Sequence, residues 1–258
     1  MIAIFFALSR EVASLKPQVN VLKKIRHGHA VFYQSEYCGF PVTLAQTGIG
    51  ENVSDAVRYL SRSFSLQLII SSGFAGSVNP TVGVGDLIIG KRILHSSWEF
   101  SEGEILIDST LSCDTSMVNL AAMVGRASDA LKTHCGDILS VNAVVRQASE
   151  KKRLGDNTSA LAVDMESFTL AEQAYSLGIP FVAARAISDG AEEDMEIEEN
   201  MVTEGGNVSV SDTARYLLSN PHHIPSLNRL RKQTKSAVDT LSAFLPNFIT
   251  QIYNSLLT

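Results

Sequence analysis

Three acidic residues stand at points where a strand or helix is expected to begin or end. Asp189 follows the apolar run 181–187, Glu11 follows the apolar N-terminal run 2–8, and Glu166 precedes a segment of helical periodicity. In open α/β sheets, ligands bind beyond the carboxyl ends of strands, where a carboxyl group can act as an acid or a base. Each acid also fits an ordinary structural position, in a turn or in the first turn of a helix. The residue types alone leave both readings open.

The segment 162–194 is expected to position two of these acids through a helix followed by a strand. Gly178 and Pro180 predict the end of the helix, since glycine just past a helix and proline beyond it are typical stop signals. Residues 181–187 are apolar except for Arg185, which is typical of a strand buried on both faces of a sheet. One helix face is indicated by apolar residues at helical spacing, namely Met165, Phe168, Ala171 and Tyr175.

Two glycine-rich segments follow other apolar runs. The sequence T-G-I-G at 47–50 stands between a predicted hairpin (30–46) and a predicted helix (53–64), but no further glycine completes a dinucleotide fingerprint, so we expect no dinucleotide site. The apolar strand 68–73 ends in G-F-A-G-S, which we expect to be a turn. A helix is predicted over 119–133 and a buried strand over 138–145.

These motifs resemble the signature of the purine nucleoside phosphorylase and nucleosidase superfamily. V-D-M-E-S, followed by an apolar helix and by R-A-I-S-D-G-A, is similar to the V-E-M-E…R-A-I-S-D pattern of methylthioadenosine/S-adenosylhomocysteine nucleosidases. The N-terminal I-A-I-F-F-A-L-S-R-E-V and the central I-x-x-G-x-A-G…P-x-x-x-x-G-D extend the match. The resemblance implies cleavage of a purine N-ribosidic bond by a three-layer α/β/α fold with a central mixed sheet.

The resemblance also implies roles for particular residues. Asp189 would donate a proton to N7 of the purine, and Glu11 would hold and activate the attacking water. Glu166 would accept hydrogen bonds from the ribose hydroxyls, with Met165 packed under the sugar. The other residues expected to bind substrate are Ser188, Phe74, Ala75, Gly76, Val144 and Val145.

The nucleophile is expected to be water. Phosphate requires a cationic partner, and the resemblance implies for a phosphorylase of this superfamily an arginine in the strand before the glycine-rich turn, where this chain has Ser71. Phe74 replaces a hydroxyl residue and Val144 replaces a base-stacking aromatic residue of nucleosidases, which makes the expected pocket more apolar. Trp98 and Phe100 are candidates for the region that receives the 5'-substituent. Three arginines remain candidates for a phosphate site: Arg10, Arg58 and Arg185.

Composition favours a single α/β domain over residues 1–258 that binds a small molecule. With 45% hydrophobic and 19% charged residues, the chain is typical of soluble globular proteins. The net charge of -6 argues against a nucleic-acid partner. The 3 cysteines are widely spaced, which indicates neither a disulfide framework nor a zinc site and fits a cytoplasmic protein. The apolar run 2–8 is too short to span a membrane. We expect no cofactor or metal, and the resemblance implies a homodimer.

Residues 195–258 are predicted to form an acidic loop and a helical extension of the same domain. Helices are expected over 211–220 and 226–244, the second bounded by Pro225 and Pro246. This extension loosely resembles that of the hopanoid-associated branch, which removes adenine from adenosylhopane, a lipid-tailed substrate. Four alternatives remain: a methylthioadenosine/S-adenosylhomocysteine nucleosidase, a futalosine hydrolase, a phosphate-dependent phosphorylase, and a non-catalytic binding or storage protein.

Overall fold

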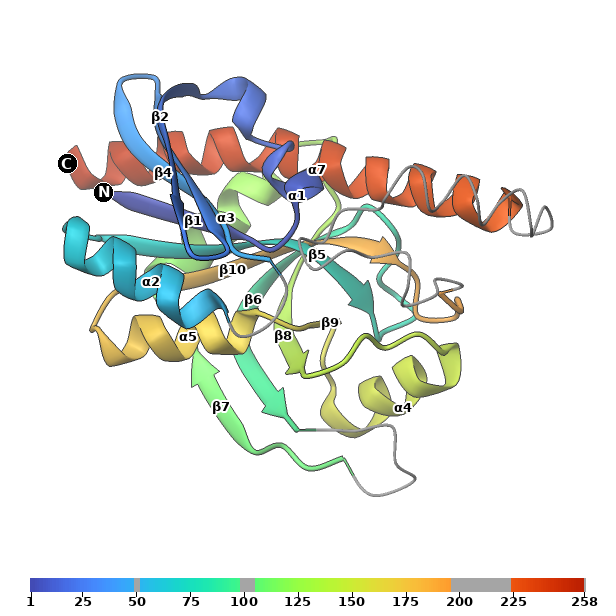
Figure 1. Cartoon of the computed structure of the whole chain (residues 1–258). Coiled ribbons are helices and arrows are strands. Elements are labelled where there is room, and N and C mark those ends of the chain that lie inside the picture. Colours follow the sequence, from blue (N-terminus) through green and yellow to red (C-terminus); the bar gives the residue numbers. More distant parts are fainter. Residues whose placement is uncertain (49–51, 98–104, 196–223, 258) are drawn as a thin grey trace.

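The computed structural model of the chain contains a mixed β-sheet with helices on both sides of it (Figure 1). It describes residues 1–48, 52–97, 105–195 and 224–257. The strands are β1 (Ile2–Phe6), β2 (Asn20–His27), β3 (Ala30–Tyr37), β4 (Phe40–Gln46), β5 (Leu68–Ser77), β6 (Leu87–Ser96), β7 (Ser109–Ser112), β8 (Thr133–Val141), β9 (Ala162–Asp164) and β10 (Phe181–Asp189). The helices are α1 (Ser9–Val12), a 3-10 turn (Lys16–Gln18), α2 (Asn52–Ser63), α3 (Thr115–Arg126), α4 (Ala148–Thr158), α5 (Ser167–Ser176) and α7 (Ile224–Leu257).

Parallel strands form the centre of the sheet. β1 pairs in parallel with β4 and β5, and β5 pairs in parallel with β10. These strands carry the apolar runs of the sequence, and their side chains are almost all buried, as expected for strands covered on both faces. The carboxyl ends of β1, β5 and β10 therefore meet at one edge of the sheet, where ligands of α/β proteins bind.

The remaining strands close part of the sheet on itself. β10 pairs antiparallel with β6, β6 pairs in parallel with β8, and β8 pairs in parallel with β9. β9 then pairs antiparallel with β5, so five strands form a closed circuit. On the other side of β1, the predicted hairpin is confirmed as β3 and β4, and β2 extends it at the edge. This closure places β9 and β10, which are distant in sequence from β5, on either side of it.

Helices cover both sides of the sheet (Figure 1). α5 packs on β5, β6 and β10 with α2 beside it, whereas α7 packs on β10 and α3. The predicted buried face of α5 is wrong in part, because Tyr175 is 78% exposed and Met165 precedes the helix. The helix instead buries Leu170, Ala171 and Ala174 against the sheet.

Helix α7 does not end at Pro246, as the sequence predicted, but continues to Leu257. Proline has no N–H to donate to the carbonyl four residues earlier, which normally breaks a helix. Here that carbonyl, of Ser242, accepts a hydrogen bond of 3.1 Å from Gln18 Nε2. Phe248 and Ile252 beyond the proline are buried, so packing keeps the helix continuous. The predicted helix over 211–220 and most of the acidic loop lie outside the described residues.

Three further boundaries differ from those predicted. The glycine-rich segment after 73 is not a turn but the end of β5. The predicted helix 119–133 is observed as α3, which begins after the N-cap residue Asp114 and ends before Thr133, where pairing with β6 begins. The predicted strand 138–145 ends at Val141, and Val144 and Val145 lie in the following loop. Pairing with distant strands, rather than local periodicity, sets the limits of β5 and β8.

Candidate functional site

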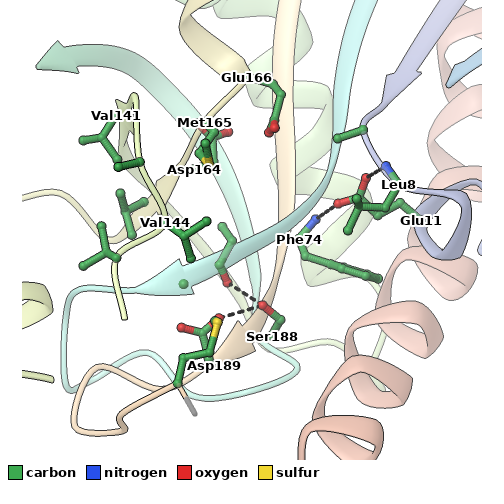
Figure 2. A pocket seen from close by; sticks show the side chains of 17 residues that line it. Leu8, Glu11, Phe74, Val141, Val144, Asp164, Met165, Glu166, Ser188 and Asp189 are labelled. Atoms are coloured by element: carbon green, nitrogen blue, oxygen red, sulfur yellow. Dashed lines mark hydrogen bonds between the residues drawn. The ribbon is translucent and has the colours of Figure 1, made fainter. Parts of the chain in front are cut away.

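A pocket of about 630 Å³, including its open mouth, lies at the carboxyl ends of β1, β5 and β10 (Figure 2). All ten residues proposed from the sequence line it: Glu11, Phe74, Ala75, Gly76, Val144, Val145, Met165, Glu166, Ser188 and Asp189. Tertiary structure therefore brings the three acids and the expected binding residues to one cavity. Trp98 and Phe100 lie outside the described residues.

Glu11 lies on one wall of the pocket, held by the backbone of two strand ends. Its Oε2 accepts a hydrogen bond from Leu8 N at 2.8 Å, and its Oε1 accepts one from Phe74 N at 2.7 Å. The residue is 4% exposed. Burial raises the pKa of the Glu11 carboxyl, while Arg185 and the backbone N–H donors oppose the rise. Glu11 is thus fixed in orientation and is a stronger base than an exposed glutamate.

A buried ion pair supports this wall. Arg185 Nε donates to Asp164 Oδ2 at 2.7 Å, and Arg185 Nη2 donates to Ser71 Oγ at 2.7 Å and to Ser167 Oγ at 2.9 Å. Both charged side chains are almost fully buried. Sequence reasoning noted Arg185 as the single charge of an apolar strand and as a candidate for a phosphate site, and it gave Asp164 no role although the V-D-M-E-S motif contains it. A charged residue in a strand that is buried on both faces requires a partner of opposite charge. This requirement could have indicated an acidic residue near Arg185.

Glu166 stands immediately before α5 and lines the pocket beside this ion pair. The pKa of Glu166 is raised to about 8, mainly by burial. Repulsion from Asp164 and Glu11 also raises this pKa, whereas the attraction of Arg185 lowers it. At neutral pH the carboxyl is therefore largely protonated. A protonated carboxyl can both donate and accept hydrogen bonds, which suits recognition of hydroxyl groups.

Asp189 lies at the end of β10, on a different wall from Glu11 (Figure 2). Its Oδ1 accepts a hydrogen bond from Ser188 Oγ at 2.7 Å, and its Oδ2 accepts one from Lys151 Nζ at 2.5 Å. Gly76 lies against the same carboxyl, since a Cβ there would be 2.9 Å from Asp189 Oδ2. Sequence reasoning missed Lys151, because a lysine followed by Lys152 and Arg153 in a polar helix is typical of an exposed surface.

The rest of the pocket is mostly apolar. The apolar lining residues are Ala7, Leu8, Phe74, Ala75, Val141, Ala143, Val144, Val145, Val163, Met165 and Met195. A flat, uncharged ring fits such walls, and the acids provide polar contacts at its edges. In the described part of the chain, no group of three or more His, Cys, Asp or Glu side chains is arranged to hold a metal ion.

A family profile described as the phosphorylase superfamily matches residues 1–219. The chain belongs to the phosphorylase superfamily. The match confirms the resemblance to this superfamily that the short motifs indicated.

Curated superfamily relatives are similar over most of the chain. A 5'-methylthioadenosine/S-adenosylhomocysteine nucleosidase of Staphylococcus epidermidis is 26% identical over 226 residues, which cover 84% of this chain and 99% of the relative. The enzyme of the same name from Staphylococcus saprophyticus is 29% identical over 204 residues, 76% of this chain and 90% of the relative.

Solved structures of the superfamily share the fold. A 5'-methylthioadenosine/S-adenosylhomocysteine nucleosidase of Neisseria meningitidis, in complex with methylthio-immucillin-A, superposes with a TM-score of 0.75 at 20% identity, covering 97% of this chain and 98% of that one. A futalosine hydrolase of Helicobacter pylori superposes with a TM-score of 0.74 at 20% identity, covering 97% of each chain. The predicted nucleoside phosphorylase-like α/β fold with a mixed sheet and a C-terminal helix is confirmed.

Proposed function

We propose that this protein cleaves the N-ribosidic bond of a 5'-substituted adenosine with water, releasing adenine. The observation that carries the proposal is the convergence of Glu11, Glu166 and Asp189 on one mostly apolar pocket. Relatives over most of the chain are named as nucleosidases of such substrates, which supports the same reaction class here.

Asp189 is the proposed acid for the departing base. Cleavage of a ribosidic bond passes through a transition state with positive charge on the sugar and negative charge developing on the leaving group. Protonation of the purine at N7 neutralises that leaving group. Ser188 donates to one oxygen of Asp189, which restrains the carboxyl at the pocket wall.

Glu166 and Met165 are the proposed contacts of the sugar. Glu166 can exchange hydrogen bonds with the ribose hydroxyls and can place negative charge near the sugar cation once it ionises. Met165 adds a polarizable apolar surface under the ring. Both residues follow β9 directly, so the short strand and the start of α5 present them together.

Glu11 is the proposed residue that orients the attacking water. Two backbone N–H donors fix its carboxyl, and its raised pKa favours acceptance of a proton from water. The same wall disfavours phosphate, because the charge of Arg185 is already matched by Asp164. Arg10 and Arg58 are not among the residues that line the pocket. A phosphate dianion would therefore face carboxyl groups without a free cation among the described lining residues.

We propose adenosylhopane as the specific substrate, because the C-terminal extension loosely resembles that of the hopanoid-associated branch. The runners-up are methylthioadenosine or S-adenosylhomocysteine and futalosine, the substrates named for the relatives and for the similar structures. We further propose a homodimer in the cytoplasm, without a cofactor. No described helix is long and apolar enough to cross a membrane.

Adenine release tests the proposal. The protein is incubated with 5'-methylthioadenosine and with a 5'-alkyl adenosine, each with and without phosphate, and free adenine is measured by chromatography. We expect adenine to be released without phosphate. The ratio of the two release rates indicates which 5'-substituent the pocket prefers. Activity only with phosphate would identify a phosphorylase. Binding of the nucleosides with no adenine from either would identify a non-catalytic binding protein.

A further inference from the structure

The segment that follows β10, residues 190–195, carries part of the pocket wall. Met195, at the end of this segment, lines the cavity. Its N–H donates to Arg146 O at 2.8 Å, in the loop after β8 that also carries the lining residue Val144. Because the segment begins beside Asp189 and ends at this loop, it closes the side of the pocket where the purine is proposed to bind.

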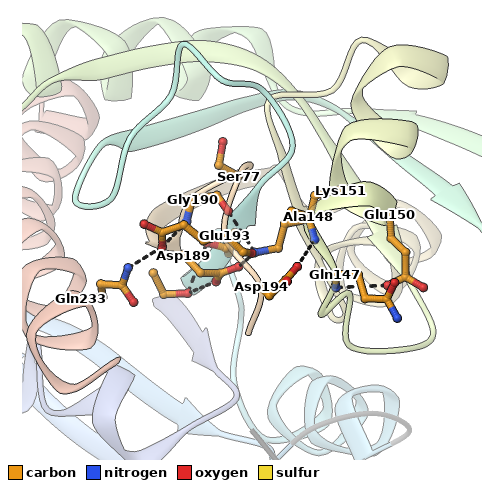
Figure 3. Close-up of polar contacts among 12 residues, drawn as sticks. Ser77, Gln147, Ala148, Glu150, Lys151, Asp189, Gly190, Glu193, Asp194 and Gln233 are labelled. Carbon is orange, nitrogen blue, oxygen red and sulfur yellow. Dashed lines mark hydrogen bonds and ion pairs between the residues drawn. The ribbon is translucent and has the colours of Figure 1, made fainter. Parts of the chain in front are cut away.

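Helix α4 holds one side of the segment 190–195. Lys151 Nζ donates to Gly190 O at 3.0 Å and to Glu193 O at 2.9 Å (Figure 3). Asp194 Oδ1 accepts a hydrogen bond of 2.8 Å from Ala148 N, at the start of α4. The oxygens of Gly190 and Glu193 in these contacts are backbone carbonyls. The attachment to α4 therefore does not depend on the side chain of Glu193.

The side chain of Glu193 attaches the same segment to α7. Its Oε2 accepts a hydrogen bond of 2.6 Å from Gln233 Nε2, and its Oε1 forms an ion pair with Arg229 (Figure 3). Gly190 N also donates to Oε2, at 3.4 Å. Burial acts to raise the pKa of Glu193, but the hydrogen bonds from Arg229 and Gln233 outweigh it and lower the pKa below its ordinary value. A half-buried carboxylate is thus held by two side chains of another element.

Glu193 acts on the pocket from outside it. The residues that line the cavity include Met195 but not Glu193. Any effect of Glu193 on a bound nucleoside therefore has to pass through the segment that it holds. Arg229 and Gln233 lie beyond residues 1–219, the part of the chain that matches the phosphorylase superfamily profile. The attachment is thus made by the C-terminal extension and not by the motifs that identify the superfamily.

Resting on the proposed function, we propose that Glu193 is a positioning residue that fixes Met195 at the base side of the pocket, so that helix α7 determines the affinity for the nucleoside. Met195 offers a polarizable apolar surface to the flat base. A wall that is ordered before binding loses less conformational entropy on binding, which raises affinity. The proposed catalytic acids, Glu11 and Asp189, lie on other elements, so the chemical step does not require Glu193.

Kinetics of adenine release from 5'-methylthioadenosine test this role. Glu193→Ala removes both contacts with α7, and we expect KM to rise about tenfold, equivalent to about 1.4 kcal/mol, while kcat stays near that of wild type. Glu193→Gln keeps an oxygen that can accept from Arg229 and Gln233, so it should restore most of the affinity. Glu192→Ala, at the neighbouring exposed glutamate, is the matched control and should change neither quantity.

A double-variant cycle tests whether Glu193 acts through Met195. Met195→Ala should raise KM, and adding Glu193→Ala to it should raise KM little further, because residues that act through one another have non-additive effects. Gln233→Ala should raise KM in the same direction as Glu193→Ala. Lys232→Ala, at an exposed position of α7, is the control for this helix. Additive effects of the Glu193 and Met195 substitutions would overturn the proposed role.

Hydrogen exchange measures the position of the wall directly, without a nucleoside. The Met195 amide is hydrogen-bonded to Arg146 O, and loss of the attachment to α7 should make this amide exchange faster in Glu193→Ala than in wild type. Amides of the buried strand β5 should keep their wild-type exchange, which also shows that the variant is folded. Wild-type exchange at Met195 in Glu193→Ala would overturn the role of Glu193.

The two proposals fail in distinguishable ways, because nucleoside and adenine affinities can be measured by calorimetry without turnover. Adenine release by the wild type, together with an unchanged KM in Glu193→Ala, would overturn the role of Glu193 and leave the hydrolase. Weaker binding of 5'-methylthioadenosine and adenine by Glu193→Ala, with no adenine released from any nucleoside by the wild type, would overturn the hydrolase and support the role of Glu193.

Discussion

Arg185 and Asp164 form an ion pair inside the molecule, with Arg185 Nε 2.7 Å from Asp164 Oδ2. They come from β10 and β9, the two strands that flank the end of β5. Next to this pair lie Glu11 and Glu166, whose pKa values are both raised by burial. Arg185 is therefore the positive charge that acts on all three acids, Asp164, Glu166 and Glu11. These charges determine the electrostatic potential of the wall that is proposed to bind water and ribose.

Loss of this cation should destabilise the fold. Arg185→Met leaves Asp164 buried without its partner, and removing one member of a buried pair costs about 3–5 kcal/mol. We expect that decrease in the free energy of unfolding, measured by urea denaturation. The double variant Arg185→Met/Asp164→Leu should recover part of it. The control, Arg58→Met at a pair with Asp55 in which both side chains are exposed, should change stability little. A wild-type midpoint for Arg185→Met would contradict the importance of the pair.

Glu166 should make stability depend on pH. Because its folded-state pKa is raised from 4.5 to about 8, the folded protein binds a proton that the unfolded chain releases in this window. Stability from this group is therefore full below pH 4.5 and falls as pH rises to about 8. The free energy of unfolding of Glu166→Gln relative to wild type should rise with pH across the window, by up to about 1.4 kcal/mol per pH unit. Parallel curves for the two proteins would refute the raised pKa.

Asp189→Asn should bind nucleoside but turn it over slowly. The amide keeps the shape of the side chain but cannot supply the proton of an acid, and general acid catalysis contributes about 10²–10⁴-fold. We expect a loss of that size in kcat with a small change in KM, measured by adenine release. Asp156→Asn, at an exposed aspartate of α4, is the control for the same exchange. Wild-type turnover in Asp189→Asn would remove Asp189 from the role of acid.

Glu11→Gln should abolish hydrolysis while adenine still binds. The amide still has an oxygen that can accept a backbone hydrogen bond, but it cannot take a proton from water, so a loss of about 10²–10⁴-fold in kcat is expected. Adenine affinity, measured by calorimetry, should stay near that of wild type because the base is proposed to bind at the Asp189 wall. Glu172→Gln, on the exposed side of α5, is the control. A large loss of adenine affinity would instead place Glu11 at the base.

Gly73→Ala should impair catalysis without a change in any acid. A Cβ at this position would lie 2.5 Å from Glu11 Oε1 and 2.7 Å from Arg185 Nη1, so both groups have to move. A displacement of about 1 Å in a catalytic group can cost about 10²-fold in rate. We expect a fall of that order in kcat/KM. Gly83→Ala is the control, because a Cβ there meets no atom within 4 Å. Equal activity of the two variants would contradict the tight packing at Glu11.

Local sequence determined much of the fold. The apolar runs of β1, β5 and β10 and the stop signals at Gly178 and Pro180 depend on neighbouring residues, and the structure has those elements. The prediction failed where distant partners decide the outcome. The limit of β8 depends on its pairing with β6. Helix α7 passes Pro246 because the residues beyond the proline are buried, and Gln18 donates to the carbonyl that the proline leaves without its helical donor.

By itself, the sequence identified the superfamily, because short motifs carry their glycines and acids at characteristic spacings, and it proposed ten of the 17 residues that line the pocket. Only the tertiary structure decided which charges meet. Arg185 and Asp164 are 21 positions apart, and Lys151 and Asp189 are 38 positions apart. Nothing in the local pattern of a polar helix distinguishes the buried Lys151 from the exposed Lys152. Burial and pairing of a charge are properties of the space around it, which forms only when β10, α4 and the closed part of the sheet come together.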